Sequence, residues 1–287
     1  MAGRITAQAL EHGRKLIRKD IPLLEVTEKV EQKIAQLGGK LAFPVNMSCD
    51  SIAAHYAAAP NDASIVKNHV LKLDVGVHIN GFVADSAITI DLSGENSDLV
   101  KASREALNKA IKEIKPGIKL GEIGACVEET ITGRGFQPIR NLSGHEVGQY
   151  IVHTGISIPN YANGEKTEIE EGMIIAVEPF ATTGVGLIKE QGSPEIFSIP
   201  VYKPVRIGFV REIVTYLETN YKHMPFSKRS LMPAFSLAQI NYALSSLKPI
   251  LREYAPLVEQ KGGFVSQAEH TMYITADKAV VLTKEDA

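Results

Sequence analysis

The chain has 287 residues, of which 44% are hydrophobic and 22% charged, and a formal net charge of −2. This composition excludes the disordered and fibrous classes, and the small net charge argues against nucleic acid or an anionic membrane as the main partner. No signal-peptide layout precedes residue 15, no apolar run approaches the roughly 18 residues of a membrane span, and the two cysteines, Cys49 and Cys126, lie in apolar stretches. We therefore expect a cytoplasmic protein with reduced thiols.

The first part of the chain predicts two helices followed by a hairpin. Apolar spacing indicates helices over 6–20 and 22–37, the second ended by a glycine pair. Residues 70–92 change to the period of a strand, and the central Asn80-Gly81 suits a type I′ turn.

The second part repeats this order of helices before strands. Helices are predicted over 97–115 and 120–133, and a short apolar strand over 173–178. Residues 184–250 contain further helical stretches, one of them capped by Ser236, and the last 25 residues look like strands. The order predicts an α+β fold in which helices cover one side of a sheet.

Two aspartates lie inside the predicted hairpin. The two-residue turn brings Gly76 opposite Asp85, with Asp74 one diagonal step away on the same face, because strand side chains alternate. Such neighbours lie about 7–8 Å apart at Cα, which suits two carboxylates that hold two metal ions about 3.5–4 Å apart. Gly76 would leave room for the metal.

The alternative is a pair of solvated aspartates on an exposed face. Asp has poor strand propensity, yet both aspartates lie in otherwise apolar strands. Buried like charges are costly unless a cation neutralises them. A metal site is therefore the favoured interpretation.

Three further acceptors, His145, Glu178 and Glu269, would complete two metal sites. His145 lies in a glycine-flanked segment, Glu178 ends the apolar run MIIAVE, and Glu269 precedes the run HTMYIT. A set of Asp, Glu and His without cysteine suits Mn, Fe, Co or Zn better than it suits a closed structural zinc site. Taken singly, each glutamate could be a solvated side chain and the histidine an ordinary core residue. The prediction of a metal site therefore depends on all five residues together.

Five segments in this order resemble the type 2 methionine aminopeptidase family over essentially the whole chain. The segment 141–155 (NLSGHEVGQYIVHTG) is the most diagnostic; the others are 43–56 (FPVNMSCDSIAAHY), the Asp-x10-Asp hairpin 74–85, 170–184 (EEGMIIAVEPFATTG) and 266–274 (SQAEHTMYI). The resemblance implies the pita-bread fold, a pseudo-symmetric α+β catalytic domain over 1–287 with a helical type 2 subdomain inserted at 185–250. The chain is similar to the short form, without a long charged N-terminal extension.

The resemblance also implies an activity, the removal of the initiator methionine from nascent proteins with small second residues. The metal ligands would be Asp74, Asp85, His145, Glu178 and Glu269. They would hold two divalent ions (Co, Mn, Fe or Zn) that activate a water and polarise the scissile carbonyl. Glu178 would act in addition as the general base.

The resemblance assigns further residues to the substrate. His153 matches a histidine that steadies the scissile amide or its developing oxyanion, and His55 matches the cleft histidine that fumagillin-type epoxides attack. Phe43, Val152 and Tyr254 match positions that line the methionine pocket, with ordinary core positions as the alternative. The family's further pocket histidine has no assigned counterpart in the insert, so the roof of the pocket is left open.

The implied partners are nascent polypeptide N-termini, with no membrane and no specific nucleic acid, and the family suggests a monomer. Between 189 and 231 seven Lys/Arg face four Glu, a balance that would suit docking at the ribosome, with an ordinary mixed surface as the alternative.

Two other functions compete with methionine removal. The first is an Xaa-Pro aminopeptidase or dipeptidase of the same fold, which usually has a large N-terminal domain, whereas only about 40 residues precede Phe43 here. The second is a non-catalytic pita-bread binding protein, which the intact ligand set argues against.

Overall fold

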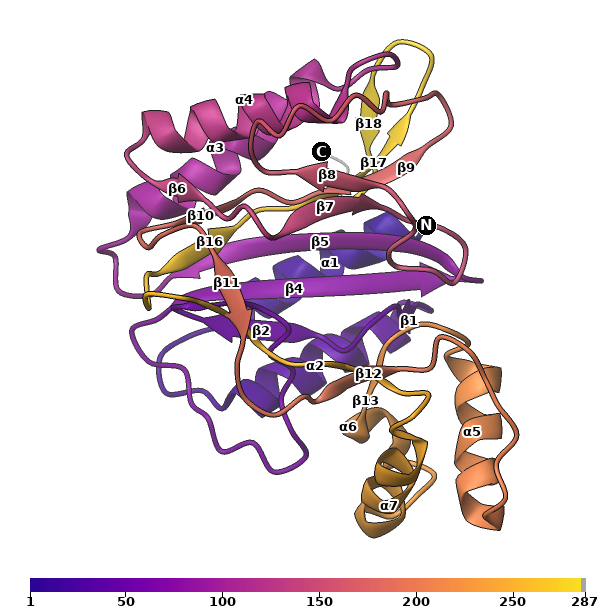
Figure 1. The fold of residues 1–287 in the computed structure, drawn as a ribbon. Coiled ribbons are helices and arrows are strands. Elements are labelled where there is room, and N and C mark those ends of the chain that lie inside the picture. Colours follow the sequence, from indigo (N-terminus) through magenta and orange to yellow (C-terminus); the bar gives the residue numbers. More distant parts are fainter. Residues whose placement is uncertain (285–287) are drawn as a thin grey trace.

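The computed structural model describes residues 1–284, which form two similarly built halves and a helical unit at one side (Figure 1). In each half a pair of helices packs on antiparallel strands. These pairs are α1 (Ala2–Leu16) with α2 (Leu23–Gln36), and α3 (Ser97–Glu113) with α4 (Leu120–Gly133). The predicted α+β architecture is confirmed, and no helix of residues 1–284 is long and apolar enough to cross a membrane.

The first half is built on a long hairpin of β4 (Val70–Ile79) and β5 (Phe82–Asp91). Its register pairs Gly76 with Asp85, as predicted, and the turn residues Asn80 and Gly81 both have positive φ, 51° and 87°, as a type I′ turn requires. β2 (Asn46–Cys49) and the short β1 (Lys40–Leu41) pair with the other edge of β4.

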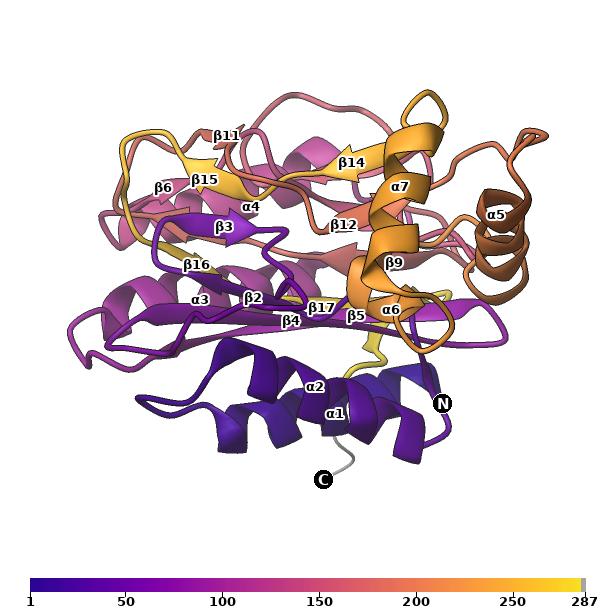
Figure 2. The same cartoon turned by 90° about the horizontal axis from the view of Figure 1, so that it is seen from below.

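Helices α1 and α2 cover the outer face of this hairpin (Figure 2). Leu71, Leu73, Val75 and Val77 of β4 are fully buried in a cluster with apolar side chains of both helices. Burial of such side chains stabilises the fold by about 1.5–3 kcal/mol each. The inner face of the hairpin is left for polar residues, and it faces the second half.

The second half contains a five-stranded sheet against which α3 and α4 pack. The order is β18 (Ala279–Val281), β17 (His270–Ile274), β9 (Ile174–Val177), β7 (Ser143–Glu146) and β8 (Ser157–Pro159). The strands predicted near residue 175 and at the C-terminal end are confirmed. Their apolar residues, among them Ile175 and Met272, share one buried cluster with Leu107 and Ile123 of the helices.

Three smaller antiparallel sheets complete the framework. Each has three strands, in the orders β16-β10-β6, β11-β15-β3 and β13-β12-β14. Their bounds are β16 (Val265–Gln267), β10 (Phe180–Thr182), β6 (Gln137–Pro138), β11 (Ile188–Glu190), β15 (Leu257–Glu259), β3 (Ile52–Ala54), β13 (Phe226–Ser227), β12 (Ile196–Ser198) and β14 (Arg252–Tyr254).

Buried hydroxyl groups join the two halves between β5 and the segment that leads into β17. Thr271 Oγ1 accepts a hydrogen bond from the N–H of Asp85 at 2.7 Å and donates one to the carbonyl of Asp85 at 2.8 Å. Ser86 Oγ donates to the carbonyl of Glu269 at 2.6 Å. Because these bonds satisfy backbone groups of both segments, they fix Asp85 and Glu269 beside each other.

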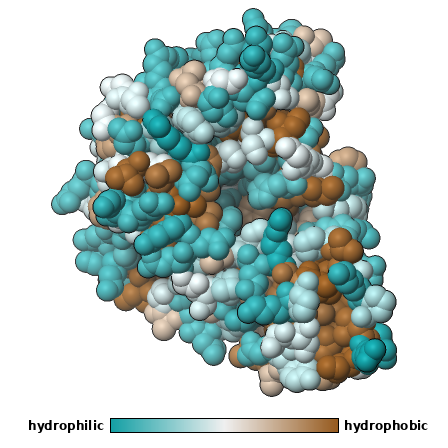
Figure 3. Space-filling model, viewed as in Figure 1, coloured by the Kyte–Doolittle hydropathy of each residue, from teal (hydrophilic) through white to brown (hydrophobic). Residues whose placement is uncertain are grey.

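The helical unit contains α5 (Gly208–Asn220), α6 (Lys228–Leu231) and α7 (Leu237–Leu247). α7 begins after Ser236, whose Oγ accepts a hydrogen bond from the N–H of Gln239, as the sequence predicts. The three helices have their own buried cluster, which includes Val210, Phe226 and Ile240. Apolar side chains also gather on the outside of this unit, at the lower right of Figure 3.

Candidate active site

One cavity of about 270 Å³ lies between the two halves, and every residue assigned to the site from sequence lines it. It brings together segments more than 200 residues apart in the chain. The ten residues are Phe43, His55, Asp74, Asp85, His145, Val152, His153, Glu178, Tyr254 and Glu269.

Each of the five expected metal ligands is placed by a strand or a strand end. Asp74 and Asp85 project from the inner face of the β4–β5 hairpin. His145 lies in β7, which pairs with β9, and Glu178 follows β9 directly. Glu269 immediately precedes β17, which pairs with β9 through His270 opposite Val177, so the two glutamates lie side by side.

The ligand atoms of these residues converge. Asp85, His145 and Glu269 each offer one ligand atom, and the three atoms lie within 4.8 Å of one another. His145 Nε2 is 3.6 Å from Asp85 Oδ2 and 3.7 Å from Glu178 Oε1. These separations are too long for hydrogen bonds. They suit donor atoms around a shared cation, because atoms bound at about 2.0–2.2 Å from one ion lie about 3–4 Å apart.

The carboxylates are buried without enough polar partners. Asp74 Oδ1, Asp85 Oδ1 and Glu269 Oε1 are inaccessible to solvent and have no hydrogen-bond partner among residues 1–284. Burial raises the pKa of Asp85 to about 7. Burial, with the neighbouring carboxylates, holds the pKa of Asp74, Glu178 and Glu269 well above the usual range. A divalent cation would offset both penalties, so the donor set fits a metal.

Gly76 has a different role from the one expected. A Cβ on Gly76 would lie 2.2 Å from Cε1 of Phe43, inside its ring. The room opposite Asp85 is therefore filled by Phe43 and is not left for a metal, which corrects the sequence-based expectation. The missing side chain at Gly76 allows Phe43 to form a wall of the cavity.

The two histidines outside the expected ligand set differ in exposure, because His55 is half-buried and His153 is exposed. The His153 ring packs edge-on against the His145 ring with 4.1 Å between centroids. Desolvation of the ring, with the nearby His145, lowers the pKa of His153 to about 3, and desolvation, with the nearby His153, lowers the pKa of His55 to about 4. His55 has a positive φ of 64° and lies edge-on to Tyr254. A neutral imidazole at neutral pH can donate one hydrogen bond and accept another.

The apolar end of the cavity is closed by residues from both the body and the helical unit. Phe43 and Val152 belong to a buried cluster that also contains Met224. Ile196 and Pro225 line the cavity beside Tyr254. These two residues form the roof that the sequence left open. His223, between α5 and α6, contacts the carbonyl of Ile199 and is not among the residues that line the cavity.

The sequence analysis missed two polar residues, Asn46 and Gln267, and the two roof residues, Ile196 and Pro225. Asn46 lines the cavity and pairs with Asp74 in the β2–β4 ladder. Gln267 Nε2 donates a hydrogen bond to Glu178 Oε2 at 3.2 Å. Both lie inside segments that carry the family resemblance and could have been found there. Ile196 and Pro225 lie between residues 185 and 250, where no motif marks them.

The fold and this cavity define a metallopeptidase. The family model of metallopeptidase family M24 matches residues 1–276, and the chain belongs to this family. Relatives within it include archaeal methionine aminopeptidases. The chain is 44% identical over 284 residues to that of Archaeoglobus fulgidus, which covers 99% of this chain and 96% of the relative. It is 42% identical over 286 residues to that of Methanocaldococcus jannaschii, with the same coverage.

Solved structures agree with this assignment. The methionine aminopeptidase of Thermotoga maritima superposes with a TM-score of 0.72 at 26% identity and covers 99% of this chain and 94% of its own. The prolidase of Pyrococcus furiosus shares the fold at 19% identity and a TM-score of 0.60, with 62% of that chain covered. The expected pita-bread fold is confirmed.

Proposed function

We propose that this enzyme is a methionine aminopeptidase, which removes the N-terminal initiator methionine from nascent proteins. The observation that carries this function is the convergence, in one cavity, of a buried Asp/His/Glu donor set and an apolar wall. Identity of 36–44% to methionine aminopeptidases over nearly the whole chain supports it. Use of divalent metal follows from membership of the metallopeptidase family.

The proposed ligands of two divalent ions (Co, Mn, Fe or Zn) are Asp74, Asp85, His145, Glu178 and Glu269. Ions bound there would supply a lowered pKa for water and polarisation of the scissile carbonyl. Glu178 takes the proton of the attacking water and passes it to the leaving amine as the C–N bond breaks. Its carboxylate is oriented for this task by the hydrogen bond from Gln267.

The neutral His153 is placed to donate a hydrogen bond to the scissile carbonyl oxygen as negative charge develops there. His55, which also lines the cavity and is held by its contact with Tyr254, binds the substrate. Phe43, Val152 and Tyr254 surround the unbranched methionine side chain. The preference for a small second residue is the one that the resemblance to this family implies.

We also propose that the enzyme acts as a monomer in the cytoplasm and that the insert at 185–250 contributes to docking near the ribosome. The support for docking is the basic balance of the insert between 189 and 231. β11 pairs with β15, so the start of that range belongs to the main body. The cluster of the helical unit itself begins at Phe197.

The decisive experiment uses chelator-stripped protein with a Met-Gly-Ser peptide and an Xaa-Pro peptide, and divalent metal is then added back. Release of free methionine from the first peptide only, with metal only, and not by Asp85→Ala supports the proposal. Cleavage before proline would assign the chain to the prolidase branch. No turnover of either peptide by metal-loaded protein would favour a non-catalytic binding role.

A further inference from the structure

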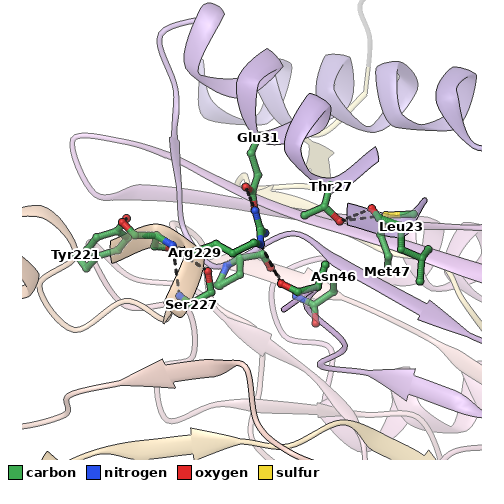
Figure 4. Close-up of polar contacts among 11 residues, drawn as sticks. Leu23, Thr27, Glu31, Asn46, Met47, Tyr221, Ser227 and Arg229 are labelled. Carbon is green, nitrogen blue, oxygen red and sulfur yellow. Dashed lines mark hydrogen bonds and ion pairs between the residues drawn. The ribbon is translucent and has the colours of Figure 1, made fainter. Parts of the chain in front are cut away.

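A buried arginine outside the proposed catalytic groups joins the helical unit to the main body. Arg229 Nη1 and Nη2 donate to the two carboxylate oxygens of Glu31 in α2 at 2.8 and 2.7 Å. Arg229 Nε donates to the carbonyl of Ala58 at 2.9 Å. Figure 4 shows Glu31 reaching from the body to meet Arg229. The two side chains are 9% and 19% exposed, so water competes little for these bonds.

These bonds bring three parts of the molecule to one point. Arg229 belongs to α6, which begins two residues after Phe226 in β13. Glu31 belongs to α2, and Ala58 follows His55 by three residues in a loop at the cavity. A planar guanidinium that uses both its fork and its Nε fixes orientation as well as distance.

The segment just before α6 supplies Pro225, one of the two roof residues of the cavity. Pro225 lines the cavity, and Met224 is buried against Phe43 and Val152 on its apolar wall. At the other end of this segment Lys222 lies over the Tyr150 ring, 5.3 Å from its centroid. Lys222 is exposed, so this contact is weaker than the Arg229–Glu31 pair.

We propose that Arg229 is a positioning residue that sets the size of the methionine pocket, because its pair with Glu31 holds Met224 and Pro225 against Phe43 and Val152. The inference rests on the proposed function. Without the pair the roof moves outward and the pocket widens, so methionine binds less tightly and bulkier side chains enter. The metal ligands lie in the other elements of the cavity and keep their positions.

The test compares Arg229→Gln, Arg229→Lys, Glu31→Gln and the double variant Glu31→Gln/Arg229→Gln, with Arg211→Gln as a control that removes an exposed charge of the same helical unit. kcat and KM are measured on Xaa-Gly-Ser peptides with methionine, norleucine, leucine or phenylalanine first, together with metal content. Arg229→Gln and Glu31→Gln are expected to raise KM for methionine roughly tenfold, and to reduce discrimination against leucine and phenylalanine by a similar factor.

In the same experiment kcat for methionine stays within about twofold and metal content is unchanged. Arg229→Lys, which keeps the charge but loses the forked guanidinium, has an intermediate KM. The KM of the double variant is no higher than that of the poorer single variant. An unchanged KM, a loss confined to kcat, or a double variant much poorer than either single variant would overturn the proposal. If Arg229→Gln does not fold, Arg229→Lys and Glu31→Gln decide the question. Failure of the wild-type enzyme to release methionine would instead reject the proposed function.

Discussion

At the scale of single residues, the site gathers ionisable groups, most of which are partly or fully buried. Four carboxylates and three imidazoles line one cavity, and burial pushes each of them toward its neutral form. Such an arrangement is unfavourable by itself and becomes favourable when a cation neutralises the carboxylates. The metal-free protein should therefore show a stability cost that is concentrated at these positions.

Asp85→Asn tests this cost through its pH dependence. The folded-state pKa of Asp85 is about 7, above the ordinary 3.8. The contribution of Asp85 to the free energy of unfolding is therefore most favourable below about pH 4 and becomes less favourable as pH rises toward 7. We expect metal-free Asp85→Asn to gain stability relative to wild type over this window, with little further change above it. Urea denaturation in the presence of chelator, at several pH values, measures the difference in free energy of unfolding between Asp85→Asn and wild type. The contributions of the histidines largely cancel in this difference, because both proteins contain them.

Exposed Asp20→Asn provides the control for this series and should show no such trend. If the free energy of unfolding differs between Asp85→Asn and wild type by the same amount from pH 4 to pH 7, the pKa of Asp85 is not raised in the folded protein.

His153→Ala tests the second residue-scale assignment, stabilisation of the developing oxyanion. Removal of one such donor should lower kcat by about 10²–10³-fold, with metal content preserved. Steady-state kinetics on a Met-Gly-Ser peptide and metal analysis provide the measurement. His12→Ala in α1 is the control, and an unaltered kcat for His153→Ala would remove this residue from the mechanism.

At the scale of elements, the β4–β5 hairpin supplies two proposed ligands and also admits a pocket wall. Its register puts Asp74 and Asp85 on the inner face, and Gly76 between them leaves space into which the Phe43 ring packs. One strand therefore couples the metal site to the apolar pocket.

Gly76→Ala should disturb both stability and substrate binding. The added Cβ overlaps the Phe43 ring, and such overpacking costs about 1–3 kcal/mol. A displaced Phe43 narrows the cavity, so KM for methionine peptides should rise. Chemical denaturation and kinetics test this, with Gly133→Ala as the matched control because a Cβ there meets no described atom within 4 Å. Wild-type behaviour of Gly76→Ala would show that Phe43 moves without consequence.

At the scale of the whole molecule, the cavity exists because two separately cored halves and a helical unit are held in a fixed arrangement. The halves are tied by hydroxyl-to-backbone bonds near Asp85 and Glu269, and the helical unit by Arg229. The cluster of α1, α2 and β4 and the cluster of α3 and α4 do not share residues. Polar contacts between the halves therefore have a direct effect on site geometry.

Thr271→Val tests the joint between the halves. Valine keeps the shape but loses both hydrogen bonds to Asp85, which leaves a buried N–H without its partner, at a cost of about 1–3 kcal/mol. Because Asp85 is a proposed ligand, metal affinity should also fall roughly tenfold or more. Denaturation and metal titration measure the two effects. Thr219→Val on the exposed face of α5 is the control, and unchanged metal affinity in Thr271→Val would separate the joint from the site.

The sequence by itself determined the elements whose signals are local. The Asn80-Gly81 turn, the helix over 120–133 and the Ser236 cap depend on neighbouring residues, and each was predicted with nearly correct bounds. The first helix ends at Leu16, earlier than predicted, because Ile17 is already extended. Short strands such as β3 and β10 were not predicted, since three residues carry no recognisable period.

The ten candidate site residues were named from strand alternation and from the family resemblance, and all ten line the cavity. Only the tertiary structure decided that Gly76 admits Phe43, that Pro225 forms the roof, and that Arg229 meets Glu31. The physical reason is the same in each case. These contacts join residues that are distant in sequence or belong to separate elements, and their energies depend on positions in space that leave no pattern in the local order of residues.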